Sequence, residues 1–289
     1  MARKPAKKPQ VETTGHEWDG IEEYNNPLPR WWLWTTYLTI IWGIGYVILY
    51  PAIPLPGGAT PGLLGYSSRA EVAADIAEVE ARNAPLVARI NELALTDISS
   101  DDLVGGAGDG FAYNGGAAVF QTFCAQCHGS GAAGSKGYPN LRDDDWLWGG
   151  SVEEIYTSIN HGIRSEADLD TRFSQMPAFG EFLNKEDIGS LVQYVGTLSG
   201  INRAEDTEVG KNLFLDNCAS CHGDDGTGDR FQGAPNLTDA IWLYGSDVAT
   251  LTETVKNARF GVMPAWSGRL SESQIRQAAV YIHALGGGE

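Results

Sequence analysis

The chain contains the motif C-x-x-C-H twice, as Cys124-Ala125-Gln126-Cys127-His128 and as Cys218-Ala219-Ser220-Cys221-His222. These are all four cysteines of a 289-residue sequence, which is too sparse for a disulfide-dense miniprotein. Both motifs stand at the same place in a longer internal repeat, so the chain is built from one unit used twice.

The repeat extends well beyond the cysteines. The first copy reads Gly116, Phe120, Cys124, Cys127, His128, Pro139-Asn140-Leu141, Trp146, Met176-Pro177-Ala178-Phe179 and Tyr194. The second reads Gly210, Phe214, Cys218, Cys221, His222, Pro235-Asn236-Leu237, Trp242, Met263-Pro264-Ala265-Trp266 and Tyr281. The first copy is longer because it has extra residues around 164–172. In each copy, apolar spacing predicts a helix before the cysteines, one in the middle and one at the end, with capping boxes at Ser151-Val152-Glu153-Glu154 and Ser271-Glu272-Ser273-Gln274.

The histidine that follows each cysteine pair decides between several uses of the thiols. A zinc ribbon would place its two pairs about 15–20 residues apart, far less than the separation between Cys127 and Cys218. A redox dithiol or a structural disulfide would leave the histidine unexplained, and the chain has only five histidines. The motif therefore predicts two covalently bound haem c groups, attached through Cys124, Cys127, Cys218 and Cys221, with His128 and His222 as axial iron ligands.

The methionines supply the candidates for the sixth ligand. Besides Met1 there are only Met176 and Met263, and each opens a Met-Pro-Ala-aromatic run at the equivalent place in its copy. Methionine opposite histidine raises the iron potential, which suits electron carriers of the c type. A gap-filling core methionine is the alternative, and His161 is the rival to Met176 at the first haem.

Several residues are predicted to support the haems. The carbonyl groups of Pro139 and Pro235 are candidates to hold the other ring nitrogen of each histidine, fixing its tautomer. Trp146 and Trp242 either contact a haem edge or propionate or are simply buried in the core. Lys136 and Arg230, in the loops before the Pro-Asn-Leu turns, are candidates to neutralise propionates.

An uncharged stretch of twenty residues, 31–50, predicts one transmembrane helix. A cleaved signal peptide is the alternative, but its apolar region is usually only about 7–15 residues long. Four bases within residues 1–10 and Arg30 at the helix edge place the N-terminus in the cytoplasm. Thr35, Thr39 and Gly43 form a stripe that could pack against another helix.

Residues 51–110 are predicted to be a linker with short helices. Ser68-Arg69-Ala70-Glu71 has the form of a capping box, and Pro85 is expected to break or kink the helix that follows. The run Gly105-Gly106-Ala107-Gly108-Asp109-Gly110 lacks the third glycine of a nucleotide-binding loop and indicates a flexible connection.

The charge is strongly acidic: 20 Lys and Arg against 37 Asp and Glu give −17. Residues 1–30 hold five bases and five acids, so the whole excess belongs to the rest of the chain. Such a polyanion is a poor nucleic-acid binder, and we expect no nucleic-acid partner.

The two repeats resemble class I cytochrome c domains in tandem. The N-terminal part narrows the resemblance to the membrane-anchored diheme subunit III of cbb3-type cytochrome c oxidases. The residues that carry it are His16-Glu17-Trp18-Asp19-Gly20-Ile21, Asn25-Asn26-Pro27-Leu28-Pro29-Arg30-Trp31-Trp32, Tyr50-Pro51-Ala52-Ile53-Pro54 and Gly65-Tyr66-Ser67-Ser68-Arg69.

The resemblance implies an all-α fold with one N-terminal transmembrane helix and two tandem class I cytochrome c domains. The expected organisation is a cytoplasmic segment at 1–30, the membrane helix at 31–50, the linker at 51–110, and haem domains at 111–200 and 203–289, on the periplasmic side of a bacterial inner membrane. The family implies that a donor cytochrome c reduces this subunit. Electrons then pass to the monohaem and catalytic subunits of a proton-pumping oxidase that reduces O₂ to water. If both methionines bind iron, neither haem has a free coordination site, so the isolated chain, for which no catalytic residue is predicted, is expected not to reduce O₂ or to be an enzyme by itself. The alternatives are a free-standing anchored diheme shuttle and a small-molecule dehydrogenase with haem domains, for which 51–110 is too short and too rich in glycine.

Overall fold

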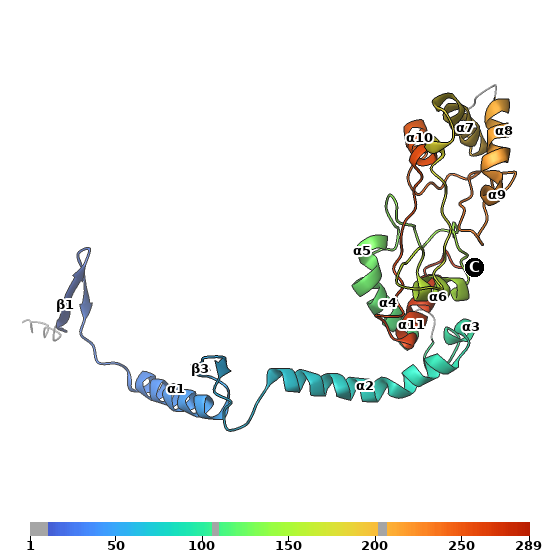
Figure 1. Ribbon diagram of the computed structural model, residues 1–289. Coiled ribbons are helices and arrows are strands. Elements are labelled where there is room, and N and C mark those ends of the chain that lie inside the picture. Colours follow the sequence, from blue (N-terminus) through green and yellow to red (C-terminus); the bar gives the residue numbers. More distant parts are fainter. Residues whose placement is uncertain (1–10, 106–109, 202–206) are drawn as a thin grey trace, which may run out of the picture. The chain divides into compact units, whose positions relative to one another are not determined.

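The computed structural model describes residues 11–105, 110–201 and 207–289 (Figure 1). The bases predicted to lie in the cytoplasm (Arg3, Lys4, Lys7 and Lys8), most of the run at 105–110, and most of the boundary between the repeats fall outside these ranges. The chain divides into two compact units, 1–81 and 82–289, and each is described by itself.

The first unit begins with a hairpin that the sequence analysis did not predict. Strand β1 (Thr13–Trp18) pairs antiparallel with β2 (Ile21–Tyr24), with Trp18 opposite Ile21. The turn residues Asp19 and Gly20 have φ of 49° and 82°, the left-handed conformation that Asp-Gly adopts in a two-residue hairpin.

Helix α1 (Arg30–Leu49) matches the predicted membrane span to within one residue at each end. None of its residues is buried, and it is long and apolar enough to cross a membrane, with a hydropathy of 1.4. The hydroxyls of Thr35 and Thr39 donate to the carbonyl oxygens of Trp31 and Thr36 at 2.9 and 2.8 Å. These polar groups are thus satisfied within the helix, as an apolar surrounding requires. The short strands β3 (Pro54–Leu55) and β4 (Gly58–Ala59) form a small hairpin after it.

Helix α2 (Ser68–Glu92) differs from the prediction at two points. It continues through Pro85 as one helix of 25 residues, and the short α3 (Leu95–Ile98) follows. The predicted capping box does not form, because Ser67 caps the helix instead: its Oγ accepts from the Ala70 N–H at 3.3 Å. The Glu71 carboxylate is bound by the Tyr66 hydroxyl at 2.6 Å.

The second unit contains the helices predicted for both repeats. The first repeat forms α4 (Phe111–Val119), the π-helix η1 (Phe120–Cys124), α5 (Ala125–His128), α6 (Val152–His161), the 3₁₀ turn η2 (Phe179–Glu181) and α7 (Lys185–Leu198). The second forms α8 (Glu208–Asn217), α9 (Ala219–His222), α10 (Val248–Asn257) and α11 (Glu272–His283). The predicted capping boxes at Ser151 and Ser271 are both present.

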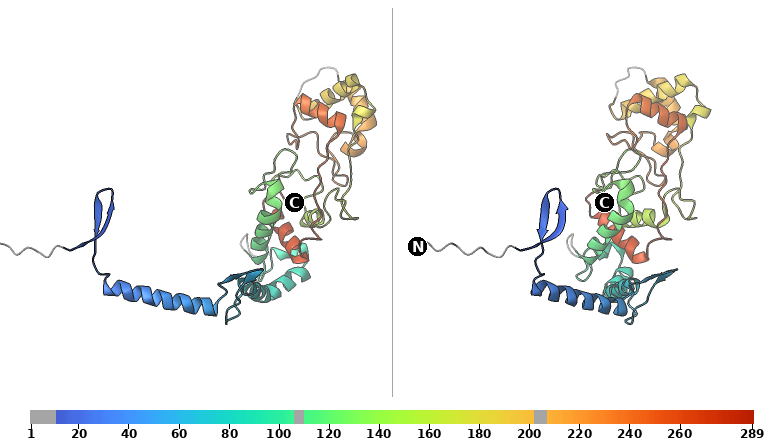
Figure 2. Two further views of the ribbon diagram at one scale, coloured as in Figure 1. Left: turned by 60° about the vertical axis from the view of Figure 1, so that its left-hand side comes forward. Right: turned by 90° about the vertical axis from the view of Figure 1, so that its left-hand side faces the viewer.

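The helices of the two repeats are exchanged between two lobes. In the first lobe, α11 of the second repeat packs against α4 and α6 of the first, with α3 beside them. In the second lobe, α7 and η2 of the first repeat pack against α8 and α10 of the second. Figures 1 and 2 show this as a red helix, α11, lying beside the green α4, far from it in sequence. The predicted domains 111–200 and 203–289 therefore do not coincide with the lobes.

Both lobes are held by the same contact between a first and a last helix. In the first lobe, the ring of Tyr281 lies 5.6 Å from that of Phe120, and a Cβ on Gly116 would come within 2.1 Å of a carbonyl oxygen of α11. In the second, the ring of Tyr194 lies 5.4 Å from that of Phe214, and a Cβ on Gly210 would clash in the same way with a carbonyl oxygen of α7. Each close contact joins a glycine-bearing helix of one repeat to the last helix of the other.

Two segments cross between the lobes and bind each other. The backbones of Ile163 and Met263 exchange two hydrogen bonds, of 2.9 and 3.0 Å. The Arg164 guanidinium donates to the Gly261 carbonyl oxygen at 2.6 Å, and Ser165 Oγ accepts from the Ala265 N–H at 3.2 Å.

Candidate haem-binding sites

Each C-x-x-C-H motif occupies the end of a helix and a sharp turn. His128 and His222 are the last residues of α5 and α9, and the glycines that follow, Gly129 and Gly223, have φ of 78° and 77°. All four cysteines are free thiols, as covalent haem attachment requires. Burial raises the pKa of Cys124 and of Cys218 to about 11, so both are neutral thiols at neutral pH.

The carbonyl groups predicted to orient the histidines do so. Nδ1 of His128 donates to the Pro139 oxygen at 3.1 Å, and Nδ1 of His222 donates to the Pro235 oxygen at 3.1 Å. Burial lowers the pKa of both imidazoles, although the carbonyl bonds act in the opposite direction. Each ring is therefore neutral, with its proton on Nδ1 and the lone pair of Nε2 left to bind a metal.

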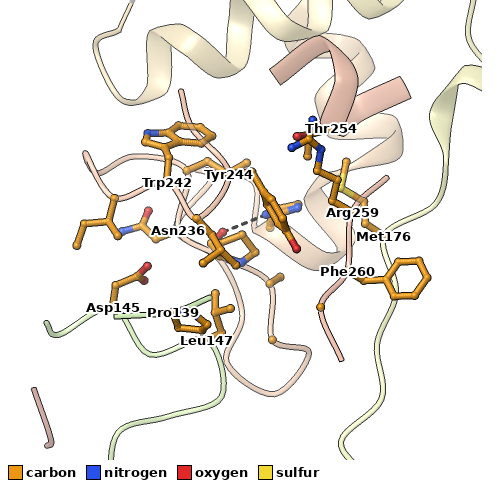
Figure 3. A pocket seen from close by; sticks show the side chains of 18 of the residues that line it. Pro139, Asp145, Leu147, Met176, Asn236, Trp242, Tyr244, Thr254, Arg259 and Phe260 are labelled. Atoms are coloured by element: carbon orange, nitrogen blue, oxygen red, sulfur yellow. Dashed lines mark hydrogen bonds between the residues drawn. The ribbon is translucent and has the colours of Figure 1, made fainter. Parts of the chain in front are cut away.

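A cavity of about 650 Å³ adjoins the second motif. Its walls include Cys218, Cys221, His222 and Met176, and its volume lies within the roughly 300–1,000 Å³ of cofactor sites. In Figure 3, Met176 and Trp242 lie on opposite sides of this cavity, and Pro139 and Leu147 reach it from the first repeat.

The hydrogen bonding of Trp242 indicates whether the cavity fits a haem. Its Nε1 is buried and has no hydrogen-bond partner among the described residues, although it lies in the cavity wall. A buried donor left unpaired is costly, and a haem propionate would satisfy it. The equivalent Trp146 donates to the Gly287 carbonyl oxygen instead. The donor set of free thiols, a neutral histidine, a methionine and an unpaired indole N–H thus fits a haem c.

The structure places each methionine in the lobe opposite to its own repeat's cysteines. Met263 packs against the core of the first lobe, as do Phe123 and Cys124. The Trp266 ring meets that of Phe123 edge-on at 5.6 Å. Met176 packs against the core of the second lobe, which includes Cys218.

Comparisons with known proteins agree with these features. Residues 10–56 match the family model of the N-terminal domain of cytochrome oxidase-cbb3, FixP, and residues 111–195 and 205–282 match cytochrome c oxidase, cbb3-type, subunit III. The chain is 56% identical to the cbb3-type cytochrome c oxidase subunit CcoP of Cereibacter sphaeroides and 52% identical to that of Rhodobacter capsulatus, covering 100% of all chains. It is 50% identical to the subunit FixP of Sinorhizobium medicae, over 96% of both chains. The chain belongs to the subunit III family of cbb3-type cytochrome c oxidases.

The two cations predicted to neutralise propionates have different surroundings in this subunit III chain. Lys136 lines the cavity, but Arg230 forms an ion pair with Glu289 at 2.5 Å. Two arginines that were not predicted, Arg164 and Arg259, also line the cavity. Burial lowers the pKa of the Arg164 guanidinium, so a nearby anion would be favoured there.

Arg259 has a counterpart that the repeat could have revealed. Arg172-Phe173 and Arg259-Phe260 each stand at the same short distance before a methionine. The guanidinium of Arg172 lies over the Trp148 ring at 5.6 Å, and that of Arg259 lies over the Tyr244 ring at 5.2 Å. Alignment of the copies backwards from the methionines would have identified this pair.

His161 is engaged elsewhere in the subunit. Its Nδ1 lies 3.2 Å from Asp168 Oδ2, and its Nε2 lies 3.0 Å from the side-chain nitrogen of Asn160. Both ring nitrogens therefore have polar neighbours, which favours a structural role over ligation in place of Met176.

Proposed function

We propose that this subunit carries two haem c groups and relays electrons from a donor cytochrome c to the monohaem and catalytic subunits of its oxidase. The observation that carries the proposal is the presence of the same ligand set twice: a C-x-x-C-H motif, a carbonyl-bound histidine and a methionine packed in each lobe. The bound haem supplies the redox-active iron.

The residues of the chain have distinct roles in this proposal. Cys124, Cys127, Cys218 and Cys221 form the covalent attachments, His128 and His222 bind iron through Nε2, and Met176 and Met263 provide the thioether ligands. The Pro139 and Pro235 carbonyls hold each histidine in the tautomer that leaves Nε2 free. Partial burial lowers the pKa of both histidines, which keeps them neutral.

With both sixth positions occupied by methionine, the chain has no open iron site and does not reduce O₂ itself. Reduction of O₂ and any coupled proton pumping belong to the complex. If carbon monoxide bound to the isolated, reduced subunit, at least one haem would have an open or labile position and this assignment would be wrong.

The proposed location is a bacterial inner membrane, with α1 as the single anchor, residues 1–30 in the cytoplasm and the haem lobes in the periplasm. The support is the apolar, unburied α1 together with the bases in residues 1–10 and at Arg30.

The experiment is purification of the full chain in mild detergent, with a haem assay and identification of whatever accompanies it. The proposal expects two haems per chain and stable association with the other oxidase subunits. A diheme chain that purifies without partners would favour the free-standing shuttle, and one haem per chain would contradict the proposed cofactor count.

A further inference from the structure

One carboxylate lies in the wall of the cavity beside the second C-x-x-C-H motif and also in the wall of a second, polar cavity. This residue is Asp145, and the second cavity has a volume of about 480 Å³. Figure 3 shows Asp145 with Leu147 in the part of the first cavity's wall that the first repeat contributes. We propose that Asp145 takes up a proton when the second haem, attached at Cys218 and Cys221, is reduced, and releases it when that haem is oxidised. This inference rests on the proposed function and adds a coupled proton to it.

The Asp145 carboxylate lacks the partner that a partly buried charge needs. Its backbone N–H donates to Asp143 Oδ1 at 3.4 Å, but within residues 11–105, 110–201 and 207–289 its carboxylate oxygens have no hydrogen bond and no ion pair. The positive charge of Arg230 acts on it, but that guanidinium is paired with Glu289 at 2.5 Å. Since an unpaired charge is costly to bury, the neutral form of Asp145 is favoured.

The charges around Asp145 act in the same direction. Asp143 and Asp144 precede it in the chain, and Asp239 acts on it from the second repeat, so three carboxylates oppose the single positive charge of Arg230 that acts on it. Burial, followed by the charges of Asp239 and Asp143, raises the pKa of Asp145 to about 6. Its carboxyl group therefore titrates near neutral pH, where a change in the charge of its surroundings shifts its protonation.

Besides Asp145, the charged side chains in the wall of the haem cavity are those of Lys136, Asp143, Arg164, Asp247 and Arg259. Asp247 accepts from the backbone N–H and the hydroxyl of Thr250 at 3.0 and 2.6 Å, which lowers the pKa of its carboxyl group and keeps it ionised. Burial raises the pKa of Asp143, but Asp143 is not part of the wall of the polar cavity. Of these three carboxylates, Asp145 is the one in the walls of both cavities.

The polar cavity offers the proton a route from solvent. Its wall also includes Asp144, Asp229 and Arg230, and because Asp144 and Arg230 are exposed, the cavity reaches the surface of the molecule. When the donor delivers one electron to the second haem, the Asp145 carboxylate takes one proton from solvent. The electron adds a negative charge near the carboxyl group, and a like charge disfavours its ionised form. On oxidation, both the electron and the proton leave.

This coupling makes the potential of the second haem depend on pH. Electron and proton binding affect each other equally, so the potential falls as the pH rises through the range in which Asp145 titrates. From about pH 5 to about pH 8, the equilibrium constant for reduction should fall by about threefold to tenfold, or about 30–60 mV for one electron. Because the haem lobes are proposed to face the periplasm, an acidic periplasm would make the second haem hold its electron more strongly.

The test is a redox titration of the full chain in detergent, repeated across this pH range. In Asp145→Asn the side chain is neutral at every pH, so the fall should be lost and the potential of the second haem should stay at the parent's low-pH value. The matched control is Asp144→Asn, which removes an exposed carboxylate from the polar cavity but not from the haem cavity. It should retain the fall.

The outcomes separate this inference from the function on which it rests. A parent potential independent of pH, an unchanged fall in Asp145→Asn, or an equal loss in Asp144→Asn would each overturn the proposed proton uptake. A chain without haem at Cys218 and Cys221 would contradict the proposed function instead.

A second measurement detects the proton directly and does not require the two potentials to be resolved. On reduction at about pH 6, the infrared difference spectrum of the parent should gain the carbonyl band of a protonated carboxyl group. Asp145→Asn should lack this band, and Asp144→Asn should keep it. A band that persists in Asp145→Asn would assign the proton to another group and overturn the proposal.

Discussion

Trp146 and Trp242 occupy equivalent positions in the two repeats but have different hydrogen-bonding environments. Trp146 Nε1 is bound to the Gly287 carbonyl oxygen, near the end of the chain. Trp242 Nε1 is buried without a partner among the described residues and lines the cavity. The indole of the first repeat therefore secures chain packing, while that of the second is free to bind an anionic group of a cofactor.

This difference predicts opposite phenotypes for the same substitution. A haem propionate bound by Trp242 would lose a donor in Trp242→Phe, so the iron would sense more negative charge and the potential of the second haem would fall, by less than about 60 mV, the equivalent of tenfold for one electron. Trp146→Phe leaves that potential unchanged but lowers stability by about 0.5–1.5 kcal/mol, the usual value of one hydrogen bond. Spectroelectrochemical titration and thermal unfolding measure the two effects. An unchanged potential in Trp242→Phe would exclude the propionate contact.

Asp145 predicts a pH dependence of stability. Burial, followed by the negative charges of Asp239 and Asp143, raises its pKa to about 6, although Arg230 acts in the opposite direction. Because the folded-state pKa lies above the usual 3.8, the stability it contributes is fully present below that value and is lost as the pH rises through about 6.

The substitution Asp145→Asn removes the carboxyl group, and with it the loss of stability that accompanies its ionisation as the pH rises. The variant should be more stable than the parent above pH 7, by about 1–2 kcal/mol after allowance for partial exposure, with the difference disappearing toward pH 4. Chemical denaturation at several pH values measures it. A constant difference across this range would show that titration of Asp145 is not the cause.

At the scale of helices, local signals were sufficient to predict most elements. The capping boxes at Ser151 and Ser271, and the helices they open, follow from residues adjacent in sequence. The hairpin at 13–24 was missed although Asp19-Gly20 is a strong turn signal, because both strands are exposed and lack an apolar alternation. The cap of α2 was misplaced by one residue because Ser67 and Ser68 offer the same hydroxyl.

The partners of the helices could not be predicted from such signals. The face of α4 that carries Gly116 and Phe120 needs a last helix with an aromatic ring, and α7 and α11 both offer one, Tyr194 and Tyr281. Since the repeats are equivalent at these positions, the apolar pattern cannot tell whether a first helix packs against the last helix of its own repeat or against that of the other repeat. The choice depends on the segments that connect the helices.

Because α4 and α11 are in close contact at Gly116, adding one methyl group there should lower the stability of the fold. In Gly116→Ala the new Cβ would lie 2.1 Å from the Gln277 oxygen and 2.6 Å from the Tyr281 Cβ, so overpacking should cost about 1–3 kcal/mol. The control is Gly189→Ala on α7, where a Cβ meets nothing within 4 Å. There the loss of backbone freedom in the unfolded chain should stabilise by about 0.5–1 kcal/mol. Thermal unfolding compares them, and equal effects would contradict the close packing of α4 on α11.

At the scale of the whole chain, the charge predicts how a donor approaches. The −17 lies outside residues 1–30 and would attract a Lys-rich cytochrome, raising the encounter rate. The rate of donor oxidation should therefore fall several-fold as salt is raised, because the screening length shortens from about 10 Å at 0.1 M to about 3 Å at 1 M. Stopped-flow oxidation of a basic donor measures this, and a rate independent of salt would exclude electrostatic docking.

The exchange of helices between the lobes sets the order in which the two lobes can be completed during synthesis. The chain is made from its N-terminus at about 5–20 residues per second, so Cys124, Cys127 and His128 emerge well before Met263. Helices α4 and α5 are therefore made several seconds before α11, which completes the first lobe, whereas α7 is already present when α8 of the second lobe arrives. Folding would therefore proceed through a state in which the first lobe lacks its last helix, supplied only when the last part of the chain has been delivered.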